Sequence, residues 1–507
     1  MTAVEDDQKA VLDFLGGRRE VKRVDTHISV VFLEPERVLK VKRAIRLPYL
    51  DYATLQKRKD ACDAELAINR RFAPAIYRRV IPITRGPAGP AIDGDGPVIE
   101  WAVEMARFDE RNTFDHLAAT GTIGPSLAEH LADTLRASHE RADVARQSSW
   151  PQSIAGLIDR NTEKFRSHAS LDRRSVEQLD ALSRQKSAAL RAIIEQRAAD
   201  GMVRRCHGDA HLANIVLIDN APVLFDAIEF DPAIATTDVL YDLAFPLMDL
   251  LHFGQGAAAN RLFNRYFEAS WRHNGSALGL MPLFLSIRAA IRAHVLLTRC
   301  EQSPHDASAA DAARAYFDLA LRLIAPAPPA LVAIGGRSGT GKSVLARAAA
   351  GLIEPMPGAL VLRSDVIRKE VFGVGPLEKL PEPAYAPDVT ESIYRMLCER
   401  ARQAVGQGCS VIVDAAYLRE SERAALGEEA RRLGVAFFPL FLDAPSQIRF
   451  DRVATRRGDA SDATREVAER QERMDLGPME WPVIDASGAP EETLQRARRH
   501  LPNPIAP

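Results

Sequence analysis

The decisive stretch of this chain is Gly336-Arg337-Ser338-Gly339-Thr340-Gly341-Lys342-Ser343. It fits the phosphate-loop pattern, also called Walker A, at every fixed position. The glycines let the backbone curl so that its N–H groups face phosphate oxygens, and the helix expected from about Lys342 adds its positive end. The pattern predicts that Lys342 reaches the β- and γ-phosphates of a nucleotide and that Ser343 ligates Mg²⁺.

The residues around this loop supply the sheet that the pattern requires. Leu331 to Gly335 is a short apolar run of the kind that is buried in a parallel sheet. Three later apolar runs end close to an acid, namely Asp365, Asp414 and Asp443. Ligands of doubly wound sheets bind outside the carboxyl ends of the strands, so we expect these acids to share one rim with the loop. We therefore predict an α/β P-loop domain with a doubly wound parallel sheet over residues 330–507.

Acids and arginines of this domain suggest how it would bind and activate a phosphoryl acceptor. Asp414 is placed to assist Mg²⁺, directly or through water, and Asp365 with Arg368 to activate and hold the acceptor. Three arginines share a helix face at spacings of three and four, which suits a lid that clamps the transferring phosphate. These arginines are Arg449, Arg452 and Arg456.

A proline-rich segment marks the main domain boundary. Ala325-Pro326-Ala327-Pro328-Pro329-Ala330 has the composition of a short semi-rigid linker. The chain of 507 residues is too long for one ordinary core, and two to three domains are expected. Upstream of the linker, the residues to about 105 are rich in strand patterns and residues 106–325 are mostly helical. This pattern predicts an α+β domain over residues 1–325.

A second phosphate-handling pattern lies inside this upstream domain. It reads His207-Gly208-Asp209-Ala210-His211-Leu212-Ala213-Asn214, and Phe225-Asp226-Ala227-Ile228-Glu229 follows it. Between them, two short strands at 215–218 and 223–226 flank residues 219–222, which have turn composition.

The expected hairpin brings three polar side chains together. Asn214 lies opposite Asp226 or its neighbour, and the loop before the first strand brings Asp209 to the same end. Two carboxylates and a carboxamide supply what phosphoryl transfer needs: oxygen ligands for Mg²⁺, and a carboxylate that orients or deprotonates an attacking hydroxyl.

These residues resemble the catalytic loop of the aminoglycoside phosphotransferase family, which also contains choline and fructosamine kinases and is related to protein kinases. The resemblance implies a bilobal protein-kinase-like fold that uses ATP and Mg²⁺. It also implies that Asp209 is the catalytic base and that Asn214 and Asp226 hold the metal.

The same resemblance assigns roles further upstream. Either Lys40 or Lys42 would contact the α- and β-phosphates, because strand alternation puts both on one side. Glu65, on the following helix, would pair with that lysine, and Met105 would lie in the hinge beneath adenine.

The carboxyl-terminal domain resembles the small P-loop kinases, which include gluconate, shikimate and zeta-toxin-type kinases. The run from Ser364 to Lys369 resembles their acceptor-site Asp-x-x-Arg, and residues 452–457 with 461–464 resemble their lid. The whole chain resembles a bacterial fusion of an aminoglycoside phosphotransferase-like domain with a P-loop, AAA-type ATP-binding domain.

Composition limits the partners of such a protein. The formal net charge is −2, so no global field draws the chain to nucleic acid or to an anionic membrane. Its five cysteines are scattered, as expected of reduced thiols in the cytoplasm. The amino terminus is acidic where a secretory signal would be basic and then apolar.

The sequence therefore predicts a cytoplasmic, bifunctional enzyme. Both domains would transfer the γ-phosphate of ATP to small hydroxylated metabolites, which the sequence does not name. In an alternative, one half catalyses while the other senses nucleotide or acts as an ATPase switch. A protein kinase is less favoured, because no activation-segment pattern stands between Asp226 and the helix expected near Asp238. Partner proteins stay unknown.

Overall fold

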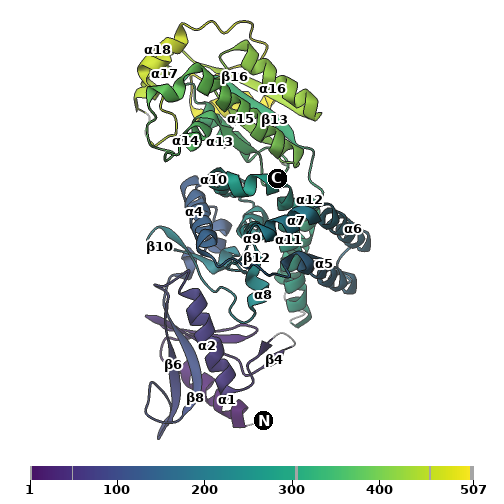
Figure 1. The fold of residues 1–507 in the computed structure, drawn as a ribbon. Helices are drawn as coiled ribbons and strands as arrows, with labels where there is room; N and C mark the ends of the chain where they lie inside the picture. The colour runs from purple at the N-terminus through teal and green to yellow at the C-terminus, as the bar shows by residue number, and fades with distance from the viewer. Residues whose placement is uncertain (1–2, 48–49, 303–306, 456–457, 503–507) are drawn as a thin grey trace. The chain divides into compact units, whose positions relative to one another are not determined.

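The computed structural model describes all residues except 1–2, 48–49, 303–306, 456–457 and 503–507 (Figure 1). The chain divides into two compact units. The first consists of residues 1–123, 133–154 and 191–249, and the second of residues 124–132, 155–190 and 250–507.

An antiparallel sheet of six strands opens the first unit, in the spatial order β1-β2-β3-β8-β6-β7. Its strands are β1 (Lys22–Asp25), β2 (Ser29–Leu33), β3 (Arg37–Lys42), β6 (Tyr77–Gly86), β7 (Gly89–Ile92) and β8 (Val98–Ala106). Helices α1 (Ala3–Gly16) and α2 (Leu55–Asn69) both pack against β8. Alternation along β3 buries Leu39 and Val41 in a core with Val11 of α1, so Lys40 and Lys42 face the other side.

The rest of the first unit consists of short strand pairs and helices. The strand pairs are β4 (Arg46–Leu47) with β5 (Leu50–Asp51), β9 (Val203–Arg205) with β12 (Thr236–Asp238), and β10 (Ile215–Ile218) with β11 (Ala221–Leu224). The helices that lie wholly or partly here are η1 (Glu110–Asn112), α3 (Phe114–Ala119), α4 (Pro125–Arg141), α5 (Trp150–Ser167), α7 (Arg191–Ala199), η2 (Leu212–Asn214), α8 (Pro232–Ala235) and α9 (Val239–His252).

The hairpin of β10 and β11 differs from the prediction in its turn and in its second strand, which spans Ala221–Leu224 instead of residues 223–226. The sequence predicts a turn over residues 219–222, but Pro222 already pairs with Leu217 in the ladder. Asp219 and Asn220 have φ angles of 49° and 61°, so two left-handed residues suffice to reverse the chain. The register still places Asn214 beside Phe225, whose N–H donates to the Asn214 carbonyl at 3.0 Å.

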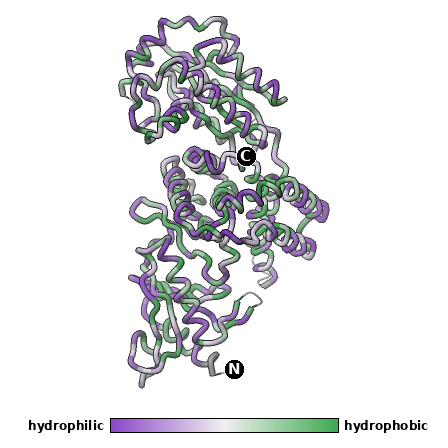
Figure 2. Tube along the Cα trace, viewed as in Figure 1, coloured by the Kyte–Doolittle hydropathy of each residue, from purple (hydrophilic) through white to green (hydrophobic). Residues whose placement is uncertain are grey.

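A parallel five-stranded sheet forms the core of the second unit, in the order β14-β15-β13-β16-β17. Its strands are β13 (Ala330–Gly336), β14 (Leu360–Arg363), β15 (Val411–Asp414), β16 (Ala436–Asp443) and β17 (Val483–Asp485). Every residue of β13 is buried, and its apolar character is visible in Figure 2. The helices that follow β13 are α13 (Lys342–Ala350), α14 (Ser364–Val371), η4 (Glu382–Tyr385), α15 (Pro387–Gly406), α16 (Glu420–Leu433), α17 (Ser446–Thr455), α18 (Arg465–Glu472), α19 (Pro490–Ala497) and η5 (Arg498–His500).

A helical region precedes this sheet in the second unit. It contains α6 (Arg173–Ala189), α10 (Gly256–Asn274), η3 (Gly275–Leu280), α11 (Met281–Gln302) and α12 (Ala307–Ile324). By length and composition the stretch Gly256–Glu301 is apolar enough to cross a membrane, but 67% of its most apolar window is buried inside the structure. Burial of this extent is typical of core helices.

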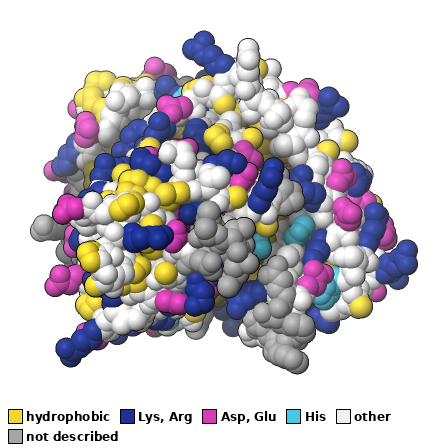
Figure 3. All heavy atoms as spheres, turned by 90° about the horizontal axis from the view of Figure 1, so that it is seen from below, with side chains coloured by type: hydrophobic (Ala, Val, Ile, Leu, Met, Phe, Trp, Pro, Cys, Tyr) yellow, Lys and Arg dark blue, Asp and Glu magenta, His cyan; other side chains and the backbone are white. Residues whose placement is uncertain are grey.

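The fold confirms the predicted succession of an α+β region and an α/β region with a doubly wound parallel sheet. Positive and negative side chains are interspersed on the face that Figure 3 shows, in keeping with the formal net charge of −2.

Candidate functional site

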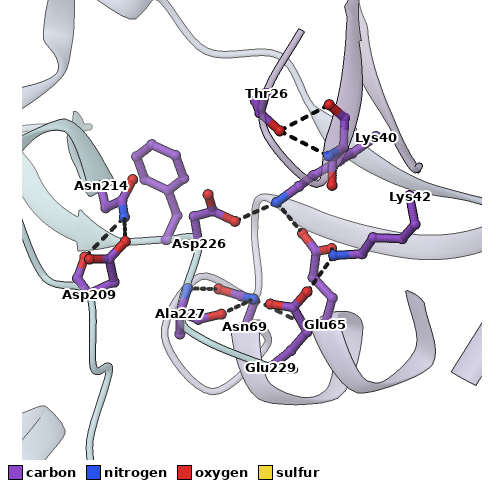
Figure 4. A network of polar contacts seen from close by, with 12 residues as sticks. Thr26, Lys40, Lys42, Glu65, Asn69, Asp209, Asn214, Asp226, Ala227 and Glu229 are labelled. Atoms are coloured by element: carbon purple, nitrogen blue, oxygen red, sulfur yellow. Dashed lines mark hydrogen bonds and ion pairs between the residues drawn. The ribbon is translucent and has the colours of Figure 1, made fainter. Parts of the chain in front are cut away.

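Two lysines meet one buried glutamate in the first unit (Figure 4). Lys40 Nζ lies 2.8 Å from Glu65 Oε1 and 2.5 Å from Asp226 Oδ1, while Lys42 Nζ lies 2.6 Å from Glu65 Oε2 and pairs with Glu229. The two lysines differ in access, because the Lys40 side chain is 12% exposed and that of Lys42 is 0% exposed. Of the two side chains, only that of Lys40 is therefore partly open to solvent.

The charges in this cluster hold one another ionised. Burial alone would lower the pKa of Lys40, but the carboxylates of Asp226 and Glu65 outweigh it and raise that pKa above the ordinary value. Burial likewise opposes ionisation of Glu65, yet Lys40 and Lys42 hold the pKa of its carboxyl below 4.5. The cluster thus presents fixed charges near neutral pH.

Asp226 owes its position to local backbone bonds. It adopts φ of 61°, an uncommon left-handed conformation, and its N–H donates to Tyr77 Oη at 3.1 Å. The next residue, Ala227, donates its N–H to Asn69 Oδ1 of α2 at 2.8 Å. These contacts turn the Asp226 carboxylate toward Lys40.

Asp209 and Asn214 lie together at the open end of the hairpin (Figure 4). Asn214 Nδ2 donates to the Asp209 carbonyl at 2.9 Å and to Asp209 Oδ2 at 3.1 Å. The side chain of Asp209 is 39% exposed. Figure 4 also shows the side chain of Asp226 beside this pair, so the three residues of the predicted set lie in one region of the structure.

Two acids that the sequence analysis did not single out anchor the loop that carries Asp209. Asp242 Oδ1 accepts the Gly208 N–H at 2.8 Å, and Asp249 Oδ2 accepts the Leu212 N–H at 3.0 Å. Both acids are buried on α9. The sequence held one signal for these two residues. They are acids at a helical spacing inside an apolar helix, and buried carboxylates need partners.

Met105 lies in β8, where it pairs with Val38 of β3 and Tyr77 of β6. Its side chain is buried in a core with Cys62. Met105 is the last but one residue of β8, so its backbone lies just before the chain leaves the sheet.

The phosphate loop of the second unit opens onto a cavity of about 980 Å³. Gly339 has φ of 86°, and a Cβ atom there would lie 2.4 Å from the Arg449 carbonyl oxygen, so only glycine fits. Lys342 Nζ donates to the Arg337 carbonyl at 3.1 Å, and Ser343 Oγ donates to Asp414 Oδ2 at 2.5 Å. The predicted residues that line this cavity are Ser338, Gly339, Thr340, Gly341, Lys342, Ser343, Asp365, Arg368, Asp414 and Arg452.

Asp365 and Arg368 lie on α14, at the wall of the cavity. Burial raises the pKa of the Asp365 carboxyl above 3.8, although the nearby Arg363 opposes the shift. Arg368 Nη1 donates to the Ala384 carbonyl at 2.5 Å, and its guanidinium lies 4.9 Å from the centre of the Tyr385 ring.

Three arginines of the predicted set bond to the protein itself. Arg337 Nε donates to the Gln471 carbonyl at 3.1 Å. Arg452 donates to the carbonyls of Ala486 at 2.7 Å and Gly488 at 2.8 Å. Arg449 is buried and pairs with Glu472. Gly336 ends β13 with φ of 141°, and Arg456 lies outside the described residues.

Arg363 is a polar residue of this site that the sequence analysis missed. Its Nη2 donates to Asp459 Oδ1 at 2.7 Å and to Ser343 Oγ at 3.1 Å, and its Nε donates to Asp414 Oδ2 at 3.3 Å. Burial would lower the pKa of Arg363, but Asp414 and Asp459 raise it. Its place at the carboxyl end of β14 could have indicated it, because ligands of doubly wound sheets bind outside the carboxyl ends of the strands.

Comparisons with known proteins give the class of each region. Residues 31–274 match the model of the phosphotransferase enzyme family, and residues 331–475 match the model of an AAA domain. The chain thus joins a kinase-like phosphotransferase region to a P-loop kinase-like region, as the sequence predicted. Both classes support phosphotransferase activity.

Particular relatives are similar along nearly the whole chain. An uncharacterized protein of Mycobacterium tuberculosis (strain H37Rv) is 26% identical over 486 residues, which cover 93% of this chain and 94% of the relative. Among solved structures, a gluconokinase from Sinorhizobium meliloti 1021 is 21% identical, with a TM-score of 0.24, over 34% of this chain and 89% of its own. A choline/ethanolamine kinase family protein from Mesorhizobium loti is 14% identical, with a TM-score of 0.38, over 63% of this chain and 99% of its own.

Proposed function

We propose that this chain is a bifunctional ATP-dependent phosphotransferase whose two regions each phosphorylate a hydroxyl group of a small metabolite. The observation that supports the proposal is that each region brings together a lysine, a carboxylate and a further oxygen-bearing side chain of its own. Lys40 with Asn214 and Asp226 form one set, and Lys342 with Ser343 and Asp414 form the other.

In the first region, Lys40 rather than Lys42 would contact the α- and β-phosphates. Glu65 and Asp226 hold the Lys40 ammonium in place, and the exposed fraction of its side chain leaves it open to a ligand. Lys42 would serve the structure by neutralising Glu65 and Glu229. Met105 would present its backbone to adenine.

Asp209 would act as the base of the first reaction. The acceptor oxygen forms a bond to the γ-phosphorus while the bond from that phosphorus to the ADP oxygen breaks, and the hydroxyl proton passes to the Asp209 carboxylate. Its exposed side chain gives an acceptor access, and Asn214 orients it through the contact at 3.1 Å.

In the second region, Asp365 would accept the hydroxyl proton, and Arg368 would hold the acceptor. Lys342 and the loop N–H groups would bind the nucleotide phosphates. Arg452 of α17 would form one wall of the cavity. We extend the lid role to Arg456 by sequence alone.

The donor atoms fit Mg²⁺ in both regions, since Mg²⁺ binds oxygen ligands from one or two carboxylates together with substrate phosphates. Ser343 and Asp414 would hold it in the second region, and Asn214 with Asp226 in the first. The metal would neutralise phosphate charge. We further propose a cytoplasmic location and no nucleic-acid or membrane partner.

A screen with two matched variants tests the two-enzyme proposal. Sugars, polyols, amino sugars and aminoglycosides are offered to the full-length chain with MgATP, and ADP and phosphorylated product are measured. Asp209→Asn should abolish one acceptor-dependent reaction, and Lys342→Ala should abolish a different one. Exposed residues supply the controls, Asp451→Asn and Lys9→Met.

Three outcomes contradict the proposal in different ways. If either variant removes every reaction, the chain has one composite site. If one region binds nucleotide tightly but never turns it over, that region is a sensor. If one region forms ADP without phosphorylating any acceptor, that region is an ATPase switch.

A further inference from the structure

Strand β14 lies at the edge of the parallel sheet, with a free side that no other strand covers in the described chain. Edge strands expose N–H and C=O groups that need partners, and proteins often cover such edges with a helix. In this chain the covering element is α10, which lies within the phosphotransferase-family region of the sequence.

Two asparagines of α10 satisfy the edge directly. Asn264 Oδ1 accepts the Val361 N–H at 2.7 Å, and Asn264 Nδ2 donates to the Ala359 carbonyl at 3.0 Å. Asn260 Nδ2 donates to the same carbonyl at 3.0 Å. One carboxamide thus bonds to the strand edge as a neighbouring strand would, with one donor and one acceptor.

The surface of the P-loop region is shaped for this close approach. Gly358 has φ of 109°, and a Cβ atom there would lie 2.6 Å from Asn260 Nδ2. A Cβ atom on Gly351 would lie 3.3 Å from the Ala257 Cα atom. Glycine at these positions lets α10 lie directly against the segment that leads into β14.

Further polar contacts continue the interface beyond β14. Arg272 Nε donates to Glu370 Oε1 of α14 at 3.3 Å, and the Arg400 guanidinium of α15 lies 5.1 Å from the centre of the Trp271 ring. Gln407 Nε2 donates to the Gly275 carbonyl at 3.0 Å, while its Oε1 accepts the Gly279 N–H at 3.1 Å. Contacts at the strand, at α14 and at α15 are more than a tether between two independent domains requires.

The interface also reaches the charges of the P-loop site. Glu268 of α10 is half-buried, and burial raises the pKa of its carboxyl. Among charged groups, Arg363 opposes that shift most strongly, ahead of Arg265 and Arg347. Arg363 in turn donates to Ser343, Asp414 and Asp459, so the charge of this α10 carboxylate acts on an arginine that contacts the phosphate-loop serine and its acidic partner.

We propose that α10 is a structural part of the P-loop site: Asn260 and Asn264 fix the edge strand β14, Glu268 adds its charge, and together they position Arg363 against Ser343 and Asp414. Asn264 and Glu268 are then positioning residues for a reaction whose phosphate loop lies in another family region. The part of this inference that concerns nucleotide rests on the proposed function of the second region. The part that concerns docking does not.

Hydrogen exchange of the full-length chain tests both parts with a local readout. Asn264→Ala should speed exchange in residues 359–363 about tenfold or more, because the Val361 N–H loses its acceptor. Exchange in β2 and β3 should stay unchanged. Glu268→Gln, which keeps the shape of the side chain, should leave exchange in β14 near the wild-type rate.

A second measurement titrates a non-hydrolysable MgATP analogue and follows the protection of residues 339–345. Each of Asn264→Ala and Glu268→Gln should raise the analogue concentration for half-maximal protection about fivefold to tenfold. Glu268→Asp should recover part of that loss, which mere loss of stability would not explain. Asn112→Ala and Glu428→Gln are the controls, since both residues are exposed and lie outside the interface.

The outcomes separate the two proposals. Unchanged exchange in residues 359–363 of the Asn264→Ala variant overturns the docking of α10. Unchanged analogue concentrations in both variants overturn its positioning role. If the analogue never protects residues 339–345 in the wild-type chain, the proposed function of the second region fails, and the exchange of β14 still decides the docking. If Asn264→Ala does not fold, Glu268→Gln decides the positioning role alone.

Discussion

The two sites of this chain are built in opposite ways. The phosphate loop is one run of eight residues between a buried strand and a helix, and its shape follows from local glycines and the helix end. The first site is assembled from distant segments: Lys40 and Asp226 are 186 residues apart in sequence and 2.5 Å apart in space. A local site carries its own geometry, whereas a distributed site depends on the fold that surrounds it.

This comparison predicts that substitutions in the second site change chemistry more than stability. Asp365→Asn should lower turnover of the proposed carboxyl-terminal reaction about a thousandfold, roughly 4 kcal/mol, because it removes the carboxylate that we propose as the base. Burial raises the pKa of Asp365, and only the carboxylate accepts a proton. The wild-type rate should therefore rise with pH through a pKa above 3.8, and the variant should lack that limb.

Steady-state rates between pH 4 and 8, with Asp451→Asn as an exposed control, provide the measurement. If the rate of the Asp365→Asn variant rises with pH in the same way as that of the wild-type chain, another residue is the base.

Lys42→Met should instead damage the fold of the first unit. The substitution leaves Glu65 and Glu229 buried without their shared cation. Breaking a buried pair costs about 3–5 kcal/mol, and we expect roughly 3 kcal/mol because Lys40 still contacts Glu65. Hydrogen exchange of β2 and β3 should report this loss, and Lys9→Met, at an exposed pair, should not. Equal protection in both variants would mean that the buried pair contributes nothing.

The difference between the sites also explains what the sequence could predict. The phosphate loop, its flanking elements and two of the three strand-end acids follow patterns within short windows, so the sequence predicts that Lys342, Ser343, Asp365 and Asp414 lie near one another. The third acid, Asp443, is not among the described residues that line the cavity. The hairpin likewise placed Asn214 beside Phe225, although its turn proved two residues shorter at the β11 side.

Choosing between Lys40 and Lys42 required tertiary contacts. Strand alternation puts both on one side, and nothing local reveals that Glu229 takes one and Asp226 the other. Arg363 escaped notice for the same reason, since its partners Asp414 and Asp459 lie 51 and 96 residues away.

Lys40→Met should weaken nucleotide binding at the first site and should loosen the sheet less than Lys42→Met does, because Lys42 still neutralises Glu65 and the Asp226 side chain is partly exposed. Loss of one charged contact to phosphate corresponds to about 2 kcal/mol, or roughly a thirtyfold rise in Kd. Calorimetric titration with an ATP analogue measures it in a chain that also carries Lys342→Ala, so that the second site is silent. If Lys42→Met weakens binding as much with an intact sheet, the two lysines have been assigned the wrong way round.

The smallest expected effect concerns Tyr52, whose hydroxyl donates to Glu229 Oε1 at 3.3 Å. Tyr52 is buried, and burial raises the pKa of its phenol, so the hydroxyl stays protonated and able to donate near neutral pH. Tyr52→Phe removes that one bond but leaves Glu229 paired with Lys42. We expect a loss of about 1 kcal/mol in the free energy of opening of the first-unit sheet and unchanged affinity for the ATP analogue. The result separates structure from chemistry within the cluster: if Tyr52→Phe weakens nucleotide binding without loosening the sheet, Glu229 and Lys42 belong to the ligand site, and the division between an open Lys40 and a structural Lys42 is wrong.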